Sequence, residues 1–200
     1  MMTQTFTLSF TSPAFLGDAG QNGAWRAPPI KALLRQWWRV AYAAQRDFGV
    51  DVSAMRHEEA RLFGHAWLED DRDEKGDKAV AARRSKVRLR LDEDGRRPSM
   101  TPPRIEQLNS ISKQYLGYGR NFKANAVIQA GGSTILRLAF PDEHISSLNE
   151  TLWLMDRFGT LGGRGRNGWG SFSLTPENGT PPLTGTLPLR NLEKCLSDGW

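Results

Sequence analysis

The clearest structural signal in this chain is STILRLAFPDEHISSLNETLWLMDRFGTLGGRGRNGWGSFSL, residues 133–174. Residues 133–140 within it predict a β-strand, and residues 141–158 predict a helix with acidic side chains near its positive end. The buried side of that helix is marked by apolar residues at helical spacing: Ile145, Leu148, Leu152 and Met155. A glycine-rich loop follows, and residues 169–174 predict a final strand. The second half of the chain therefore has the order strand, helix, glycine-rich loop, strand.

The N-terminal part of the chain predicts another strand and another helix. Residues 5–10 alternate apolar and polar side chains, which is typical of a half-buried strand. Residues 28–49 predict a helix that begins at two prolines, because the first helical turn needs no amide donors. Its apolar stripe consists of Ile30, Leu33, Leu34, Trp37 and Ala41. We expect Trp37 to lie in the core, whereas Trp38 lies at the edge of the stripe, where a core role and a ligand-binding role both remain open.

The middle of the chain is less regular. Residues 54–68 predict a short helix, and the charge run over residues 69–84 predicts a solvated loop. Residues 85–91 alternate apolar with basic side chains, which predicts a strand with a basic face. Residues 105–132 leave the type of element open.

The coarse order of these elements is β-α-β-β-α-β, the ferredoxin-like (RRM-like) pattern of the α+β class. We therefore expect one ferredoxin-like domain over residues 1–175, with insertions and with the glycine-rich loop before its last strand. Residues 176–200 are rich in Pro, Gly and Thr, and we expect them to form a C-terminal tail.

Length and composition narrow the functional classes. A chain of 200 residues forms one domain, or one domain with a substantial insertion, and its net charge of +5 favours an anionic partner. Cys195 is the only cysteine, so no internal disulfide forms and a reducing compartment, the cytoplasm, is expected. The sequence contains no apolar run of membrane-spanning length and no signal-peptide pattern, so we expect no membrane partner.

The loop LGGRGRNGWGSF, residues 161–172, combines flexible backbone with fixed positive charge. It satisfies the pattern G-x-G-x-x-G, but it follows a helix and opens a strand, which is the reverse of a dinucleotide-binding loop. We expect its glycines to let the main chain approach a polyanion closely with amides facing phosphate, chiefly at Gly162, Gly163 and Gly165. In an extended loop Arg164 and Arg166 would project to the same side and hold successive phosphates, with Trp169 anchoring the loop to the core.

A second basic surface is predicted on the helix over residues 28–49. Its basic side chains recur every four residues on a flank away from the apolar stripe: Lys31, Arg35 and Arg39. Arg26 lies just before the helix, whose N-terminal amides also attract phosphate. These residues complete the predicted phosphate-binding set, and we expect the basic flank of the helix to be solvated rather than structural.

The sequence predicts no metal site, no cofactor and no catalytic residue. Its histidines, His57, His65 and His144, do not form a metal-binding pattern. One enzymatic alternative stays open, in which His57 or His65 acts as a general base for RNA cleavage together with Tyr115, Tyr118 and Arg120.

Several segments together resemble the RAMP superfamily of CRISPR-associated proteins. They are SPAFLG near the N-terminus, RAPPIKALLRQWWR, LFG at residues 62–64 and the glycine-rich loop. Within the superfamily the chain looks most like the first-numbered subunit of the type III-B (Cmr) effector complex, whose members usually carry two ferredoxin-like domains. The resemblance implies a ferredoxin-like fold and RNA binding in a guide-RNA-directed antiviral complex.

The resemblance and the residues together lead to one main expectation and two alternatives. We expect a non-catalytic subunit that binds guide RNA or target RNA and contacts other CRISPR effector subunits. The first alternative is a metal-independent RAMP endoribonuclease that processes guide RNA. The second is a structural protein whose basic surface docks an acidic partner.

Overall fold

The structure is a computed structural model of the chain. It describes residues 1–19, 22–66, 68, 71–73, 75–76, 78–92, 127–177, 179–191 and 193–194. Most of the segment over residues 105–132, for which the sequence leaves the element type open, lies outside the described residues.

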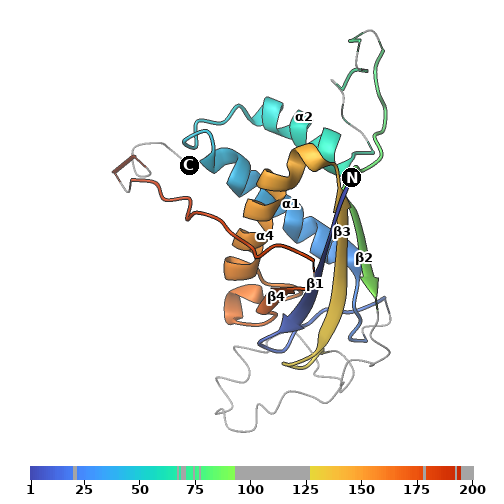
Figure 1. Ribbon diagram of the computed structural model, residues 1–200, viewed down its shortest axis with the longest axis vertical. Helices are drawn as coiled ribbons and strands as arrows, with labels where there is room; N and C mark the ends of the chain where they lie inside the picture. Colours follow the sequence, from blue (N-terminus) through green and yellow to red (C-terminus); the bar gives the residue numbers. More distant parts are fainter. Residues whose placement is uncertain are drawn as a thin grey trace.

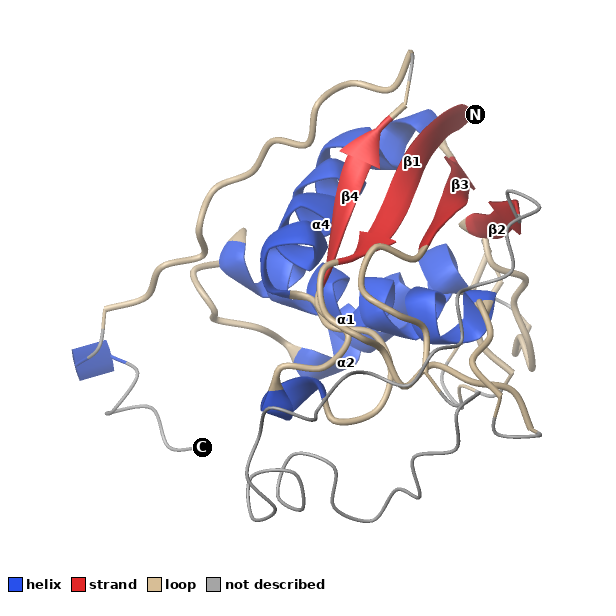
Figure 2. Cartoon of the chain, turned by 90° about the horizontal axis from the view of Figure 1, so that it is seen from below, coloured by secondary structure: helices blue, strands red, loops and turns tan. Residues whose placement is uncertain are grey.

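The domain is built on a four-stranded sheet, shown in Figures 1 and 2. Its strands are β1 (Met2–Phe10), β2 (Arg88–Asp92), β3 (Ser133–Phe140) and β4 (Phe172–Pro176). They lie in the order β2-β3-β1-β4, and each neighbouring pair is antiparallel. The predicted combination of helices with a β-sheet is confirmed, and the sheet is antiparallel.

Three helices and two short 3-10 turns complete the described structure. The helices are α1 (Ala27–Ala44), α2 (Val52–Phe63) and α4 (Ile145–Phe158), and the turns are η1 (Asp142–His144) and η2 (Gly165–Asn167). Figure 1 shows α1 and α4 side by side on one face of the sheet, with α2 beyond α1.

The core lies between that face of the sheet and the helices. In β1, Phe6, Leu8 and Phe10 are buried, while the intervening residues on the other face are polar and less buried. The same alternation occurs in β3, where Leu136, Leu138 and Phe140 are buried. Burial of alternate residues is what the period-2 pattern of the sequence predicts for a sheet covered on one side.

The ends of the helices follow local chemistry. The two prolines occupy the first turn of α1, as predicted. The carboxylate of Asp51 caps α2 by accepting hydrogen bonds from the amides of Ser53 and Ala54. α2 ends at Phe63, earlier than predicted, because the next residue, Gly64, has φ 77°, which is not a helical conformation. Glycine is required there, since a Cβ would lie 2.6 Å from the carbonyl oxygen of Arg83. The predicted final strand also begins later, at Phe172.

The assignment of the tryptophan pair on α1 is corrected by the structure. Trp38 is 5% exposed, and its ring packs against Tyr42 and against Phe63 of α2. Trp37, expected in the core, is only half-buried and packs at the edge of the core. α2 packs on the side of α1 that carries Trp38, which turns the buried stripe toward that residue.

The two tryptophans predict different costs of truncation. Trp38→Ala is expected to lower the free energy of unfolding by about 3–5 kcal/mol, because it removes a buried ring and leaves a cavity. Trp37→Ala on the same helix is the matched control and is expected to cost clearly less. Urea unfolding of the two variants measures the difference, and equal losses would contradict the assignment of Trp38 as the core residue.

Candidate nucleic-acid interface

An open pocket of about 730 Å³, which we call the arginine pocket, lies where three segments of the chain meet. One wall is α1, which contributes Arg35, Gln36 and Arg39. The other walls are residues 15–18, which follow β1, and residues 160–162 at the start of the glycine-rich loop. The fold therefore brings the basic flank of α1 next to the glycine-rich loop, although the two are far apart in the sequence.

Main-chain hydrogen bonds attach the glycine-rich loop to the segment after β1. The amide of Gly163 donates to the carbonyl of Phe15 at 3.0 Å, and the amide of Gly170 donates to the carbonyl of Pro13 at 2.9 Å. The amide of Leu161 donates to the carbonyl of Gly170 and closes the loop on itself. The Gly163 amide is thus used inside the protein, which corrects the expectation that it faces phosphate.

Internal packing also accounts for two other glycines of the predicted set. Gly162 has φ 96°, and a Cβ at this position would lie 2.5 Å from the carbonyl oxygen of Phe15. A Cβ at Gly165 would collide with the hydroxyl of Thr160. Sequence reasoning assigned this close approach to RNA, but the chain makes it with its own groups, backbone at Gly162 and the Thr160 side chain at Gly165.

The loop is not extended, contrary to the sequence-based expectation. Arg164 adopts a left-handed conformation with φ 64°, and Gly165–Asn167 form a 3-10 turn closed by a hydrogen bond from the amide of Asn167 to the carbonyl of Arg164. The two-residue alternation that would align Arg164 with Arg166 is therefore absent. Arg166 is exposed and Arg164 is half-buried, and neither forms an ion pair with any residue that the structure describes.

Trp169 anchors the loop, as predicted. Its side chain is 8% exposed, and its ring centroid lies 4.9 Å from that of Phe15. Val127 completes this small cluster. Phe15 therefore holds the loop through both its side chain and its carbonyl group.

Arg35 and Arg39 are structural as well as surface residues. Arg35 Nε donates to Glu59 Oε1 at 2.6 Å, and Arg39 Nε donates to Glu59 Oε2 at 2.7 Å. The carboxylate of Glu59, on α2, is only 4% exposed. The side chains of Arg35 and Arg39 are 37% and 46% exposed, and both residues line the arginine pocket. This corrects the expectation of a purely solvated flank.

The charges of this triad are fixed by its geometry. Burial raises the pKa of Glu59, but the hydrogen bonds from Arg39 and Arg35 outweigh burial and hold that pKa below its usual value. The hydrogen bond to Glu59 raises the pKa of Arg39. Nothing in the local sequence of Glu59 distinguishes it from neighbouring Glu58, and sequence reasoning therefore missed it.

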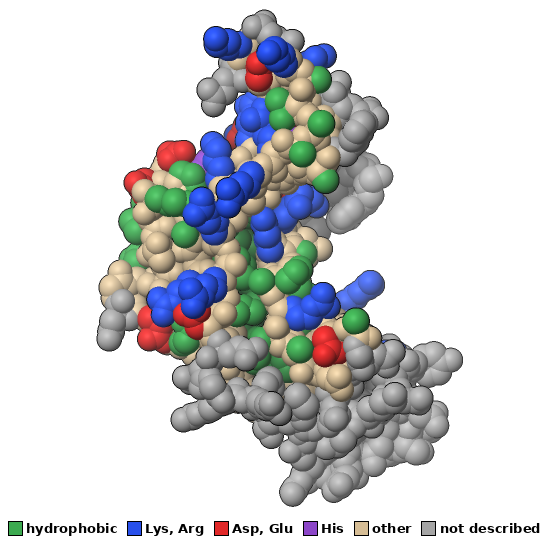
Figure 3. Space-filling view, turned by 90° about the vertical axis from the view of Figure 1, so that its right-hand side faces the viewer, with side chains coloured by type: hydrophobic (Ala, Val, Ile, Leu, Met, Phe, Trp, Pro, Cys, Tyr) green, Lys and Arg blue, Asp and Glu red, His purple; other side chains and the backbone are tan. Residues whose placement is uncertain are grey.

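Lys31 and Arg26 lie toward the start of α1. Lys31 lines a second open pocket of about 470 Å³, which it shares with Arg35 and with Arg88 at the start of β2. Burial, and then the charge of Arg35, lower the pKa of Lys31. Arg26 is exposed and donates from Nη1 to the carbonyl of Gly17 at 2.9 Å. Figure 3 shows Lys and Arg side chains spread over the face on the β2 side, interrupted by hydrophobic ones.

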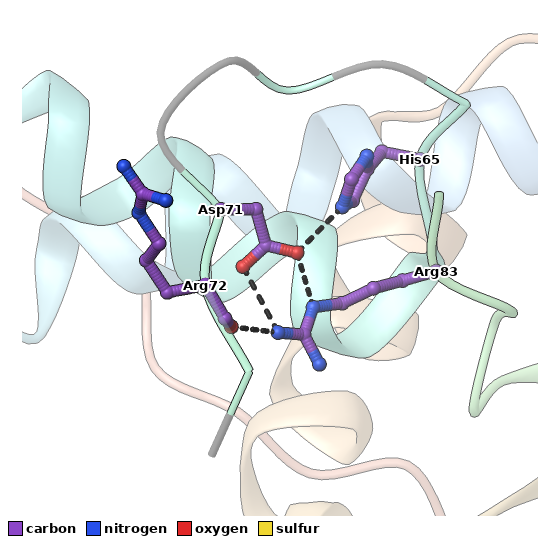
Figure 4. Close-up of polar contacts among 4 residues, drawn as sticks. All are labelled: His65, Asp71, Arg72 and Arg83. Carbon is purple, nitrogen blue, oxygen red and sulfur yellow. Dashed lines mark hydrogen bonds and ion pairs between the residues drawn. The ribbon is translucent and has the colours of Figure 1, made fainter. Parts of the chain in front are cut away.

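The charge run after α2 is not wholly solvated, because it contains a buried ion cluster (Figure 4). Asp71 is 1% exposed; His65 Nε2 lies 2.8 Å from its Oδ2, and Arg83 makes two hydrogen bonds to its carboxylate. Arg83 also donates to the carbonyl of Arg72. The hydrogen bond from Arg83 is the largest influence on Asp71 and, with help from His65, lowers its pKa to about 2 despite burial.

The other ingredients of the enzymatic alternative are not assembled in the part of the chain that the structure describes. His57 is half-buried on α2. The Nε2 atom of His144 lies 4.0 Å from Oε1 of the neighbouring Glu143. Tyr115, Tyr118 and Arg120 lie outside the described residues. The described residues contain no group of three or more side chains suited to hold a metal ion, and none of their helices is long and apolar enough to cross a membrane.

Removing both arginines that hold Glu59 is expected to destabilise the protein. Arg35→Ala with Arg39→Ala leaves a buried carboxylate without a partner, for which the expected loss is about 3–5 kcal/mol in the free energy of unfolding. Adding Glu59→Gln to this pair removes the buried charge and is expected to restore part of the loss. Urea unfolding tests both, and a loss below about 1 kcal/mol in the alanine pair would place the triad among ordinary surface ion pairs.

The Asp71 cluster predicts a pH-dependent contribution to stability. Because the folded pKa lies below the usual 3.8, the contribution is complete above that pH and is lost as the pH falls toward about 2. Asp71→Asn is expected to lower stability by at least about 1 kcal/mol at pH 7, and the deficit should shrink in acid. Asp142→Asn is the control, because the side chain of Asp142 is 63% exposed whereas that of Asp71 is buried. A deficit that stays constant from pH 7 to pH 2 would exclude the cluster as its source.

Comparisons with known proteins agree with this architecture. One similar solved structure is that of Cmr1 from Pyrococcus furiosus in its apo form, with a TM-score of 0.56 and 20% sequence identity. The match covers 90% of this chain and 51% of that chain, so this chain spans about half the length of that protein. A chain of a type IV-B CRISPR complex matches with a TM-score of 0.51 and 15% identity, over 99% of this chain and 100% of that chain.

The sequence itself gives a family assignment. A search of curated proteins with the sequence of this chain found no match. The family model of the RAMP superfamily matches residues 7–173, which include the end of β1, the α1 flank and the glycine-rich loop. The chain therefore belongs to the RAMP superfamily.

Proposed function

We propose that this chain is an RNA-binding, non-catalytic subunit of a guide-RNA-directed CRISPR effector complex, type III and Cmr-like, that acts in antiviral defence in the cytoplasm. The observation that carries the proposal is the arginine pocket, which joins α1 to the glycine-rich loop in a RAMP-superfamily chain. Guanidinium groups suit phosphate because they present several donors in a plane. The partners are guide RNA or target RNA and other effector subunits.

The proposed RNA-binding residues come from two segments. They are Arg26, Lys31, Arg35 and Arg39 at α1, and Gly162, Gly163, Arg164, Gly165 and Arg166 in the loop. Their roles differ, because Arg35 and Arg39 share the charge of Glu59 and the loop arginines pair with no described acidic residue. We assign phosphate contacts to both pairs of arginines, and assign to the three glycines the shape of the loop that presents Arg164 and Arg166.

The proposed fold is a ferredoxin-like domain over residues 1–175, followed by a tail. The strand order β2-β3-β1-β4 and the helices on one face support it, with α2 and the segment before β2 as an insertion. Residues that follow β4 pack back on the domain: the amide of Thr5 donates to the hydroxyl of Thr180, and Leu183 contacts the core.

Two effector complexes are candidates for this subunit. The likeness to Cmr1 supports a type III-B complex, in which a chain of about half that length would supply one RNA-binding domain. The second candidate is a type IV-B CRISPR complex. It is favoured by the match to a chain of such a complex, which covers 99% of this chain and 100% of that chain. Purifying the protein with its native partners and identifying them distinguishes the two.

The endoribonuclease alternative remains testable through the histidines. His65 already pairs with Asp71 and lies apart from the residues that line the arginine pocket. We propose instead that binding, without cleavage, is the contribution of this chain.

The loop arginines provide the decisive test of RNA binding. Arg164→Ala with Arg166→Ala is expected to weaken binding of single-stranded RNA by about tenfold or more, because two charged hydrogen-bond donors are removed. The slope of log affinity against log salt should become shallower by about 0.7 for each phosphate that the variant no longer neutralises. Fluorescence anisotropy over a series of KCl concentrations measures both quantities.

Lys75→Ala with Lys78→Ala removes the same charge from exposed positions and is the matched control. It should have a much smaller effect, since these lysines lie between α2 and β2, outside both the glycine-rich loop and α1. Equal losses in the two double variants would show that only net charge matters, and the assignment to the loop would then be wrong.

A further inference from the structure

An aromatic pair joins α1 to α4: Trp37, at the edge of the core, and Phe158. The ring centroids of Trp37 and Phe158 are 5.9 Å apart, with an interplanar angle of 35°. Phe158, the last residue of α4, is 51% exposed, and it is the only aromatic residue among the strongly exposed large hydrophobic side chains of the described residues.

The aromatic pair lines a hollow of about 250 Å³, which we call the aromatic hollow, together with Leu33 and Val40. Its remaining lining residues are Gln36 and Thr160. Leu33, Gln36 and Thr160 also line the arginine pocket. The two hollows therefore form one continuous surface, with arginines at one end, an amide and a hydroxyl in the middle and aromatic rings at the other end.

The order of these groups along the surface matches the parts of a nucleotide, a phosphate at one end and a base at the other. Phosphate is favoured beside the guanidinium groups of Arg35 and Arg39. A base offers a π-face to an exposed ring and polar edges to an amide or hydroxyl, and base–aromatic stacking is how many proteins hold single strands in a basic groove. An apolar protein segment would fit the rings but would gain nothing from the adjacent positive charge.

We propose that Trp37 and Phe158 form a stacking platform for a base of single-stranded RNA whose phosphates lie in the arginine pocket. The proposal rests on the RNA-binding function proposed above and specifies its ligand. A base inside a duplex is already stacked between its neighbours and cannot lie on the platform, so the site selects unpaired RNA.

The test is Phe158→Ala, measured with a single-stranded RNA and with the same backbone carrying abasic positions. Affinity for the base-bearing RNA is expected to fall by about fivefold or more, while affinity for the abasic strand stays unchanged. Phe158→Tyr keeps a ring and should retain binding. Trp37→Ala is the second variant, and it is also expected to lose more affinity for the base-bearing strand than for the abasic strand. Thermal unfolding of each variant shows whether it is folded.

Three results overturn the proposal. The first is an unchanged affinity of Phe158→Ala for base-bearing RNA, and the second is an equal loss of affinity for both strands. The third is a Phe158→Ala variant that binds RNA normally but fails to assemble with other subunits, which would identify a protein-docking surface. If the unsubstituted chain binds neither strand, the RNA-binding function itself fails. If it binds both and Phe158→Ala has no effect, only the stacking platform fails.

Discussion

The main-chain contact between the glycine-rich loop and residues 13–15 is the constraint on which the interface depends. Gly163 and Gly170 donate hydrogen bonds to carbonyl groups of that segment, and a Cβ at Gly162 would collide with Phe15. The arginine pocket exists because the loop lies directly on this backbone, opposite α1. The glycines therefore shape the pocket from inside, and the arginines are left to provide the charge.

Charge in the interface is distributed unevenly. Glu59 neutralises part of the field of Arg35 and Arg39 while locking both side chains in place through three short hydrogen bonds. Such an arrangement reduces the entropy that each guanidinium would lose on binding an anion. The exposed Arg166, in contrast, keeps its full charge and its freedom. We infer that α1 contributes preorganised donors and the loop contributes net attraction.

Sequence periodicity predicted the elements but not their partners. The strand Ser133–Phe140 and the buried side of α4 follow from local alternation, since each depends on a single repeating pattern. Periodicity placed Trp37 rather than Trp38 in the core, and this was wrong because Phe63 on another helix determines which of the two adjacent residues is buried. The Glu59 triad and the folded shape of the loop were missed for the same reason, because each depends on residues distant in the sequence. The proposed RNA-binding set follows from residue type, whereas the positions of its members in space required the fold.

The position of Phe15 and Gly163 in the chain affects when the pocket forms. Their hydrogen bond joins the N-terminal strand segment to a loop that is made only after α4. Contacts between such distant parts of a chain form late, because the closure of a long loop must come first. During synthesis on the ribosome, α1 and its arginines emerge long before the glycine-rich loop can meet them. The arginine pocket is thus a property of the completed domain, and nascent fragments with the same basic helix do not present it.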